Sequence, residues 1–202
     1  MKAMSNSSAQ QGVAKRRYRL DRRAEKKLET RRRIVESAVD LHGTVGPAHT
    51  SVAQIAERAG IQRHTYYAHF PDERSLFLAC SGLAMERDPL PDPAELARLP
   101  AGGDRIRTGL ERFYGWYERN AGLAGCVLRD AEHHALTREM VELRMAPAFA
   151  EASALLGEGL DARGRALLEV ALDFACWRVL GETQGIKAAA DLMTDAITGV
   201  SR

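Results

Sequence analysis

The segment from Ala59 to Phe70, AGIQRHTYYAHF, constrains the fold more than any other part of the chain. It lies between two stretches with the apolar spacing of helices, and it combines one glycine and three aromatic rings with several polar side chains. A buried core helix does not carry this many polar groups, and a linker does not carry this many rings. Gly60 suits the left-handed backbone just past a helix end, where a Cβ would be strained. The segment therefore predicts a tight turn followed by a short helix.

Two more helices are predicted ahead of this turn. The first has an apolar face made of Ile34, Ala38 and Leu41, which recur at helical spacing. The second begins after Ser51, which forms a capping-box pattern with the glutamine three residues later. Together with the short helix at residues 62–68, they predict a three-helix version of the helix-turn-helix. In that motif the last helix enters the major groove of DNA.

The short helix divides its side chains between two faces. Tyr66 and Phe70 are four residues apart and face inward together with Ile61. The residues left facing outward are Gln62, Arg63, His64 and Tyr67. Because arginine pairs with guanine and glutamine with adenine through two hydrogen bonds each, Gln62 and Arg63 are the candidates for base readout. A solvated surface pair is the alternative interpretation.

Residues 50–77, TSVAQIAERAGIQRHTYYAHFPDERSLF, resemble the N-terminal domain of the tetracycline-repressor-like (TetR) family. The shared features are a Thr-Ser-Val start, an Ile-Ala-x-x-Ala-Gly turn and a Thr-x-Tyr-x-His-Phe recognition helix, and the strong match covers residues 34–77. The resemblance implies an all-α fold, with a homeodomain-like helix-turn-helix domain before a C-terminal helical bundle. It also implies a homodimer that binds double-stranded DNA and a small-molecule effector.

By position, the resemblance implies DNA contacts for Thr65, Tyr67 and His69 in the short helix and for Ser51 at the start of the preceding one. The chain departs from the family at three positions. Tyr66 replaces the usual leucine, His64 stands where a small residue is common, and Glu73 stands where lysine is common. Arg74 is the expected substitute for that lysine.

The charges are distributed unevenly along the chain. Residues 15–33 contain 11 lysines and arginines against 3 acidic residues, whereas residues 34–202 contain 17 against 24. This cationic arm predicts a localised polyanionic partner. We expect it to extend the first helix or to lie along a groove of DNA, with Arg31 and Arg32 at phosphates. A solvated helix face and insertion of the RRYR piece into the minor groove are the alternatives.

We divide the chain into three parts. Residues 1–14 are small and polar and are predicted to be a disordered tail. Residues 15–71 form the basic arm and DNA-binding domain, and residues 72–202 form the effector-binding and dimerisation domain. The helix expected at residues 72–86 is the predicted transmitter between the domains, because it alone joins them. After a proline- and glycine-rich loop at residues 87–104, helices are predicted to the end of the chain.

The C-terminal domain offers candidates for an effector pocket, which is usually apolar with a few polar groups. The candidates are Trp116, Trp177, Met140 and Phe149, and core packing is the alternative for each. The last two predicted helices, at residues 162–182 and 186–200, carry more apolar surface than one bundle layer needs. Pairing them with their symmetry mates predicts a homodimer and therefore a palindromic operator.

Other classes of function find little support. The sequence has no nucleophile elbow, phosphate loop or zinc signature, so neither an enzyme nor a cofactor or metal is predicted. No long apolar run suggests a membrane span, and a cytoplasmic location is the default. We expect a repressor that an effector releases from its operator. The rivals are a constitutive architectural DNA binder whose C-terminal half only dimerises and a helical enzyme that retains a DNA-binding domain.

Overall fold

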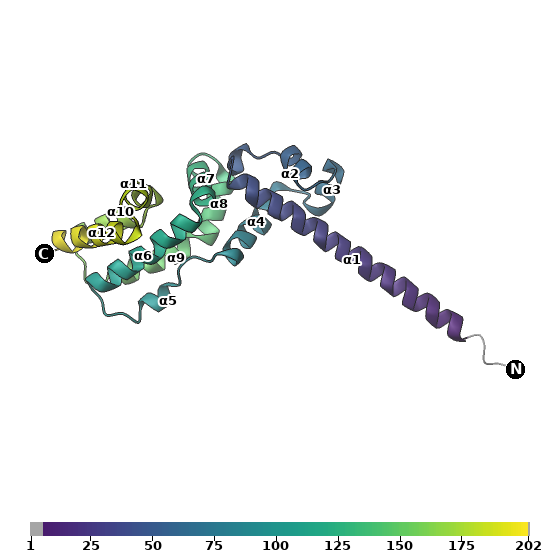
Figure 1. Ribbon diagram of the computed structural model, residues 1–202, viewed down its shortest axis with the longest axis horizontal. Coiled ribbons are helices and arrows are strands. Elements are labelled where there is room, and N and C mark those ends of the chain that lie inside the picture. Colours follow the sequence, from purple (N-terminus) through teal and green to yellow (C-terminus); the bar gives the residue numbers. More distant parts are fainter. Residues whose placement is uncertain (1–5, 202) are drawn as a thin grey trace.

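The computed structural model describes residues 6–201, and within this range every regular element is a helix (Figure 1). In chain order the elements are α1 (Asn6–His42), the 3-10 helix η1 (Pro47–His49), α2 (Val52–Arg58), α3 (Arg63–His69), α4 (Glu73–Arg87), α5 (Pro93–Leu96), α6 (Gly103–Arg119), α7 (Ala121–Ala131), α8 (Ala135–Arg144), α9 (Ala146–Leu156), α10 (Ala162–Leu172), α11 (Phe174–Gln184) and α12 (Ile186–Val200). The predicted all-α, two-domain fold is confirmed. None of the described helices has the length and apolarity that crossing a bilayer requires.

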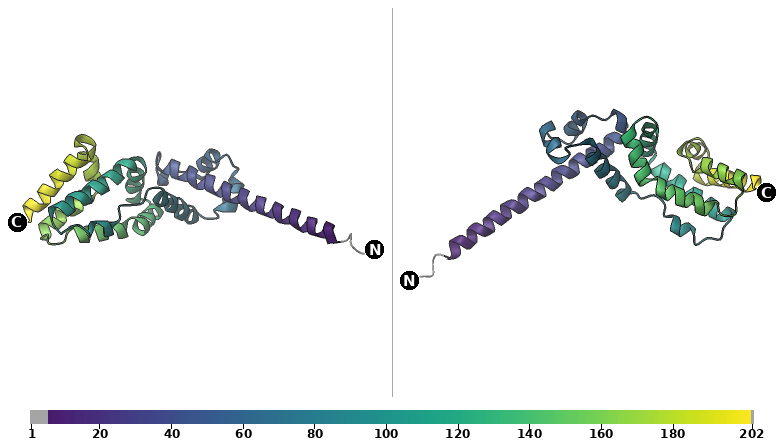
Figure 2. Two further views of the ribbon diagram at one scale, coloured as in Figure 1. Left: turned by 60° about the horizontal axis from the view of Figure 1, so that its bottom comes forward. Right: turned by 180° about the vertical axis from the view of Figure 1, so that it is seen from behind.

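The first helix is much longer than the domain it belongs to, and its N-terminal half projects away from the rest of the molecule (Figures 1 and 2). Residues 6–14, where the sequence predicted a disordered tail, continue this helix, and residues 1–5 of that tail lie outside the described residues. Adding residues to an existing helix requires no new nucleation, and the segment contains no proline to stop it.

The N-terminal domain has its own hydrophobic core, built from α1, α2, α3 and the first half of α4. Its buried members are Ile34, Val35, Ala38, Leu41, Ile55, Ala59, Tyr66, Phe70, Leu76 and Cys80. The inward faces predicted for the first helix and for the short third helix are therefore confirmed. α4 contributes to both domains, since Leu76 and Cys80 belong to this core while Met85 packs against the second one.

Two local signals in the sequence shape this domain as expected. The Ser51 hydroxyl accepts a hydrogen bond from the Gln54 backbone N–H, and the Gln54 side chain accepts one from the Ser51 N–H, which completes the capping box. Gly60 has a φ of +64°, the left-handed conformation that ends α2 and begins the turn to α3. The turn therefore fixes the direction in which α3 leaves the domain.

The C-terminal core is centred on α6 and differs from prediction at one helix break. The sequence suggested one helix over residues 162–182, but Asp173 separates α10 from α11 by accepting a hydrogen bond from the Ala175 N–H at 2.7 Å. The break frees carbonyl groups at the end of α10. The Tyr114 hydroxyl donates to the Ala171 carbonyl at 2.9 Å, and the Tyr117 hydroxyl donates to the Leu172 carbonyl at 2.8 Å. Two buried phenols of α6 thus find partners because the helix ends there.

Candidate functional site

The outer face of α3 is exposed, as the sequence predicted. Gln62 is the N-cap residue of α3, and its side chain makes no capping hydrogen bond. Arg63, His64 and Tyr67 are also exposed, and 53% of the Tyr67 surface is accessible. These four residues therefore present amide, guanidinium, imidazole and phenol groups to solvent, the types of side chain that contact base edges and phosphates.

The other residues expected at DNA lie around this face. Ser51 and Tyr67 border the same groove of about 340 Å³, between the start of α2 and the turn from α3 to α4. Thr65 is half-buried, and its hydroxyl lies 3.3 Å from Nε2 of His64. The buried Tyr66 also lines this groove, and burial together with the charge of Glu73 raises its pKa to about 12. The Tyr66 phenol thus stays protonated at neutral pH.

Arg31 and Arg32 differ in their surroundings although they are adjacent. Arg31 donates from Nη1 to the His69 carbonyl at 3.0 Å, and its guanidinium carbon lies 4.1 Å from the centre of the Phe70 ring. Arg32 is exposed and pairs with Glu36 at 3.2 Å within the same helix. Arg31 therefore holds the C-terminal end of α3 against α1, and DNA contact by either arginine stays a prediction.

Positive charges surround the C-terminal end of α3. The pKa of His69 is lowered, first by burial and then by the positive charges of Lys27 and Arg31. Both cations come from α1, which passes this end of the helix. An anion approaching α3 here is attracted by both of these charges.

Arg74, which was expected to substitute for the lysine common at position 73 in the family, has a partner within the protein. It pairs with Glu139 of α8, with Nη2 2.6 Å and Nε 2.8 Å from the same carboxylate oxygen. Its guanidinium thus joins the first turn of α4, which follows α3 directly, to the C-terminal domain. No local pattern indicates this contact, because the two residues are 65 positions apart along the chain.

A second connection joins the domains through η1 and α7. The Ala48 N–H donates to Oδ2 of the fully buried Asp130 at 2.9 Å, and Arg129 donates from Nε to the other oxygen at 2.8 Å. Burial raises the pKa of Asp130, but these hydrogen bonds outweigh burial and the net shift is downward. Asp130 is therefore an ionised anchor for η1. The prediction that α4 alone joins the domains is wrong, since η1 and α7 contact each other as well.

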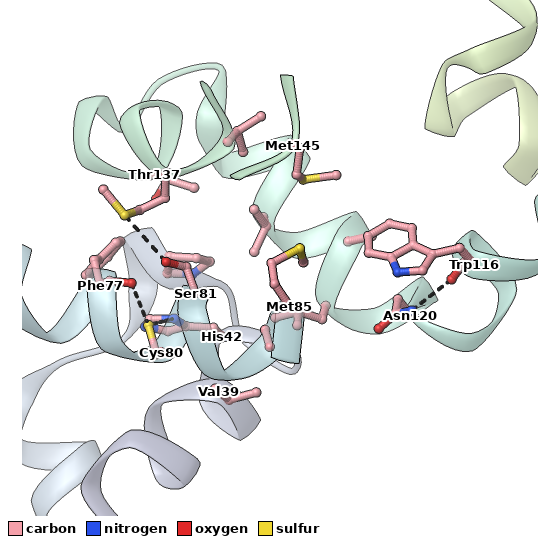
Figure 3. A pocket seen from close by; sticks show the side chains of 17 residues that line it. Val39, His42, Phe77, Cys80, Ser81, Met85, Trp116, Asn120, Thr137 and Met145 are labelled. Atoms are coloured by element: carbon pink, nitrogen blue, oxygen red, sulfur yellow. Dashed lines mark hydrogen bonds between the residues drawn. The ribbon is translucent and has the colours of Figure 1, made fainter. Parts of the chain in front are cut away.

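A small apolar cavity of about 70 Å³, the joint cavity, lies at this junction (Figure 3). Its walls come from α1, η1 and α4 on one side and from α6, α7 and α8 on the other. Two of the predicted effector residues line it, Trp116 and Met140. The indole N–H of Trp116 donates to the Asp88 carbonyl at 3.0 Å, so the ring is held in place by the chain that leaves α4.

The polar groups of the joint cavity are few and largely neutral. Burial, opposed by Asp130 and assisted by His134, lowers the pKa of His42 to about 4. The Cys80 sulfur lies 3.7 Å from Nδ1 of His42, and burial raises the pKa of this thiol to about 12. At neutral pH the cavity therefore presents an uncharged imidazole and an uncharged thiol among aliphatic, thioether and aromatic groups.

A second cavity of about 670 Å³ adjoins the joint cavity, and Val141 and Met145 line both. Phe149, the third predicted effector residue, lines this second cavity together with more polar groups such as Glu169. Trp177 lines neither cavity and is packed in the C-terminal core. Its indole N–H has no hydrogen-bond partner among the described residues. The four predicted effector residues are thus divided among two adjacent cavities and the core.

Comparison with known proteins identifies the N-terminal domain. Residues 34–80 match the sequence model described as "Bacterial regulatory proteins, tetR family". The search of curated proteins finds no match. Among solved structures, RolR in complex with the ligand resorcinol is similar with a TM-score of 0.45 and 18% identity, covering 89% of this chain and 96% of that chain. The family match runs from the buried part of α1 into α4 and includes both helices of the helix-turn-helix. Residues 34–80 therefore form a DNA-binding domain of the type found in the bacterial regulatory proteins of the tetR family.

Proposed function

We propose that the protein is a homodimeric repressor that a small, mainly apolar effector releases from a palindromic operator. The proposal rests on the position of the joint cavity. Its walls belong both to the domain that contains α3 and to the C-terminal bundle. A molecule bound there contacts both domains at once. Its binding therefore favours one arrangement of α3 relative to the bundle over another.

The joint cavity is so small that neighbouring side chains and helices must move when an effector binds there. At about 70 Å³ it is smaller than typical small-molecule sites of roughly 300–1,000 Å³. An effector gains room when the unbranched, flexible Met145 side chain turns aside and opens the way to the second cavity. Occupation of both spaces then separates α8 from α4. The Arg74–Glu139 pair carries that displacement to the beginning of α4, next to α3.

The apolar residues exposed on the last three helices support the dimer. Val170 of α10, Val179 of α11 and Leu192 of α12 are 54%, 63% and 47% exposed. Other apolar residues of α12, such as Met193 and Ile197, are buried within the protomer in the C-terminal core. Two-fold pairing through the exposed residues gives two copies of α3 and hence two operator half-sites.

Selection of bound sequences from a random duplex pool tests the DNA-binding part of the proposal. The full chain is compared with Arg63→Ala and with the control Arg58→Ala, which changes an exposed arginine of α2 that pairs with Asp40. We expect a palindrome with the parent and with the control. Arg63→Ala is expected to lose about 10- to 100-fold in affinity and to relax one position in each half-site. Tight binding without any enriched sequence would favour the architectural DNA binder.

Release from the selected operator tests the effector part. Compounds that dissociate the labelled duplex from the parent are applied to Ala84→Leu, which fills the joint cavity, and to Ala154→Leu, which alters the wall of the second cavity. We expect Ala84→Leu to bind the operator as the parent does but to lose the response to the compound. A full response of Ala84→Leu would show that the joint cavity is not the effector site.

A further inference from the structure

The part of α1 from Tyr18 to Glu29 packs against no other described element. From Tyr18 to Glu29 every residue is exposed, and the helix projects away from both domains (Figures 1 and 2). Most helices in proteins are stabilised by burying an apolar face, and this segment buries none. Apart from the exposed Tyr18, Leu20 and Leu28, the surface that it presents is mainly charged.

The charges on this segment are arranged in rows. Arg19, Arg23 and Lys27 follow one another at a spacing of four residues, which places them along one side of the helix. The acidic residues of the segment have the same spacing and are displaced by two positions, or by about 200° around the helix axis. They are Asp21, Glu25 and Glu29. The helix thus has a cationic row on one side and an acidic row on the opposite side.

The cationic row leads directly to the recognition helix. Its next position is Arg31, which donates to the His69 carbonyl and stacks on Phe70 at the end of α3. Lys27 is close enough to contribute to the lowered pKa of His69. The ion pairs of α1 among the described residues involve Arg32, Glu36 and Asp40, none of which belongs to the row. The row therefore extends the positive surface of α3 outward by about 18 Å at 1.5 Å per residue.

We propose that Arg19, Arg23 and Lys27 lie along the phosphate backbone of DNA just outside the half-site that α3 contacts. The proposal rests on DNA binding by α3 and adds a sequence-independent surface to it. Duplex DNA carries one negative charge per about 1.7 Å of its axis. Cations separated by one turn of α1, about 6 Å, can each contact a different phosphate. The acidic row faces away from the duplex and determines which side of the helix is used.

The test compares two triple variants of the full chain. Arg19→Gln with Arg23→Gln and Lys27→Gln removes the cationic row, and Asp21→Asn with Glu25→Gln and Glu29→Gln removes the acidic row. Glutamine is a good helix former, and circular dichroism verifies that helix content is retained. Binding is measured over a range of salt concentrations with three labelled duplexes. These are a duplex of about 40 base pairs containing the selected operator, a mixed-sequence duplex of equal length and the operator trimmed of its flanks.

Loss of the cationic row should flatten the dependence of log affinity on log salt by about 2.7 for each protomer, because three phosphate contacts contribute about 0.9 each. The change is expected with both long duplexes and should largely disappear with the trimmed operator. Removal of the acidic row should leave the slope unchanged and raise affinity slightly.

Three results would overturn the proposal: an unchanged slope, an equal loss on the trimmed operator, or an equal loss in the acidic-row variant. A fourth result comes from titration with phosphatidylcholine–phosphatidylserine vesicles. If the cationic-row variant binds these vesicles more weakly than the parent does while its DNA binding is unchanged, the row contacts a membrane surface instead of DNA. The mixed-sequence duplex keeps this test separate from the proposed repressor function, since it needs no operator. A recovered operator combined with an unchanged slope would reject the cationic row alone.

Discussion

Arg31 joins two helices through a single guanidinium group, and its neighbour Arg32 provides a natural control. The Arg31 group donates to a carbonyl at the C-terminal end of α3 and stacks on the ring of Phe70. A hydrogen bond from a charged donor stabilises a fold by about 1.5–3 kcal/mol, and a cation–π contact by about 0.5–2 kcal/mol. Arg32 has only an exposed pair with Glu36, which is worth about 0.3–0.5 kcal/mol.

Arg31→Ala is therefore expected to lower the free energy of unfolding by about 2 kcal/mol, and Arg32→Ala by less than about 0.5 kcal/mol. Operator affinity should follow the same order because Arg31 fixes the position of α3. Denaturant unfolding followed by circular dichroism, together with operator titrations, measures both quantities. Equal effects of the two substitutions would show that Arg31 has no positioning role.

His42 predicts how the stability of the protein depends on pH. Its pKa in the folded chain, about 4, lies below the ordinary value of 6.5, so between these values the unfolded chain binds a proton that the folded chain does not. Stability is therefore lost as the pH falls from about 6.5 towards about 4. The lowered pKa of Asp130 acts in the same direction at lower pH.

Between about pH 7 and about pH 5, the parent should lose on the order of 2 kcal/mol more stability than His42→Gln, which cannot titrate. Urea unfolding at the two pH values gives the comparison. The interpretation fails if the variant and the parent lose stability equally over this range.

At the scale of elements, the start of η1 packs so closely against α7 that Gly46, its N-cap residue, has no space for a side chain. Gly46 has a φ of +100°, and a Cβ there would overlap the Asp130 carboxylate and the Arg129 guanidinium. Gly102 has a comparable φ of +129° but has open space around it. Substitution of either glycine by alanine strains the backbone, but only at Gly46 does it also disturb the packing between the domains. Comparing the two variants therefore isolates the contribution of that packing.

Gly46→Ala should therefore destabilise the protein by about 1–3 kcal/mol more than Gly102→Ala, in the range typical of overpacking. The Ala48 amide, which donates to Asp130, should also exchange its hydrogen faster in Gly46→Ala. Hydrogen exchange resolved by residue, combined with denaturant unfolding, tests this. Equal destabilisation by the two substitutions, with Ala48 still protected, would contradict it.

The sequence was sufficient wherever the signal was local. Helical spacing predicted that Tyr66 and Phe70 are buried, and the capping box and Gly60 predicted both ends of α2. The break at Asp173 was missed because an aspartate inside an apolar helical pattern resembles an exposed helix residue as closely as an N-cap. The anchor made by Asp130 depends on residues 82 positions apart, and no pattern along the chain indicates it.

At the scale of the whole molecule, the proposed dimer depends on exposed apolar residues. Val179→Glu places a charge on the proposed interface, and Leu143→Glu places one on α8 at a residue of similar type and 48% exposure. We expect the first variant to sediment as a monomer and the second as a dimer. The monomer should bind the operator about 100-fold more weakly, since its half-sites are no longer bound jointly. A dimer formed by Val179→Glu would place the interface elsewhere.

The walls of the joint cavity come from both domains, and this gives ligand and DNA a reciprocal relation. The four states of the protein, with neither, either or both partners bound, form a closed cycle whose free energies sum to zero. A ligand that weakens DNA binding by some factor must itself be bound more weakly by the same factor when DNA is present. An unknown ligand of this cavity can therefore be identified as a regulator without any measurement of transcription, from two calorimetric titrations with and without the operator.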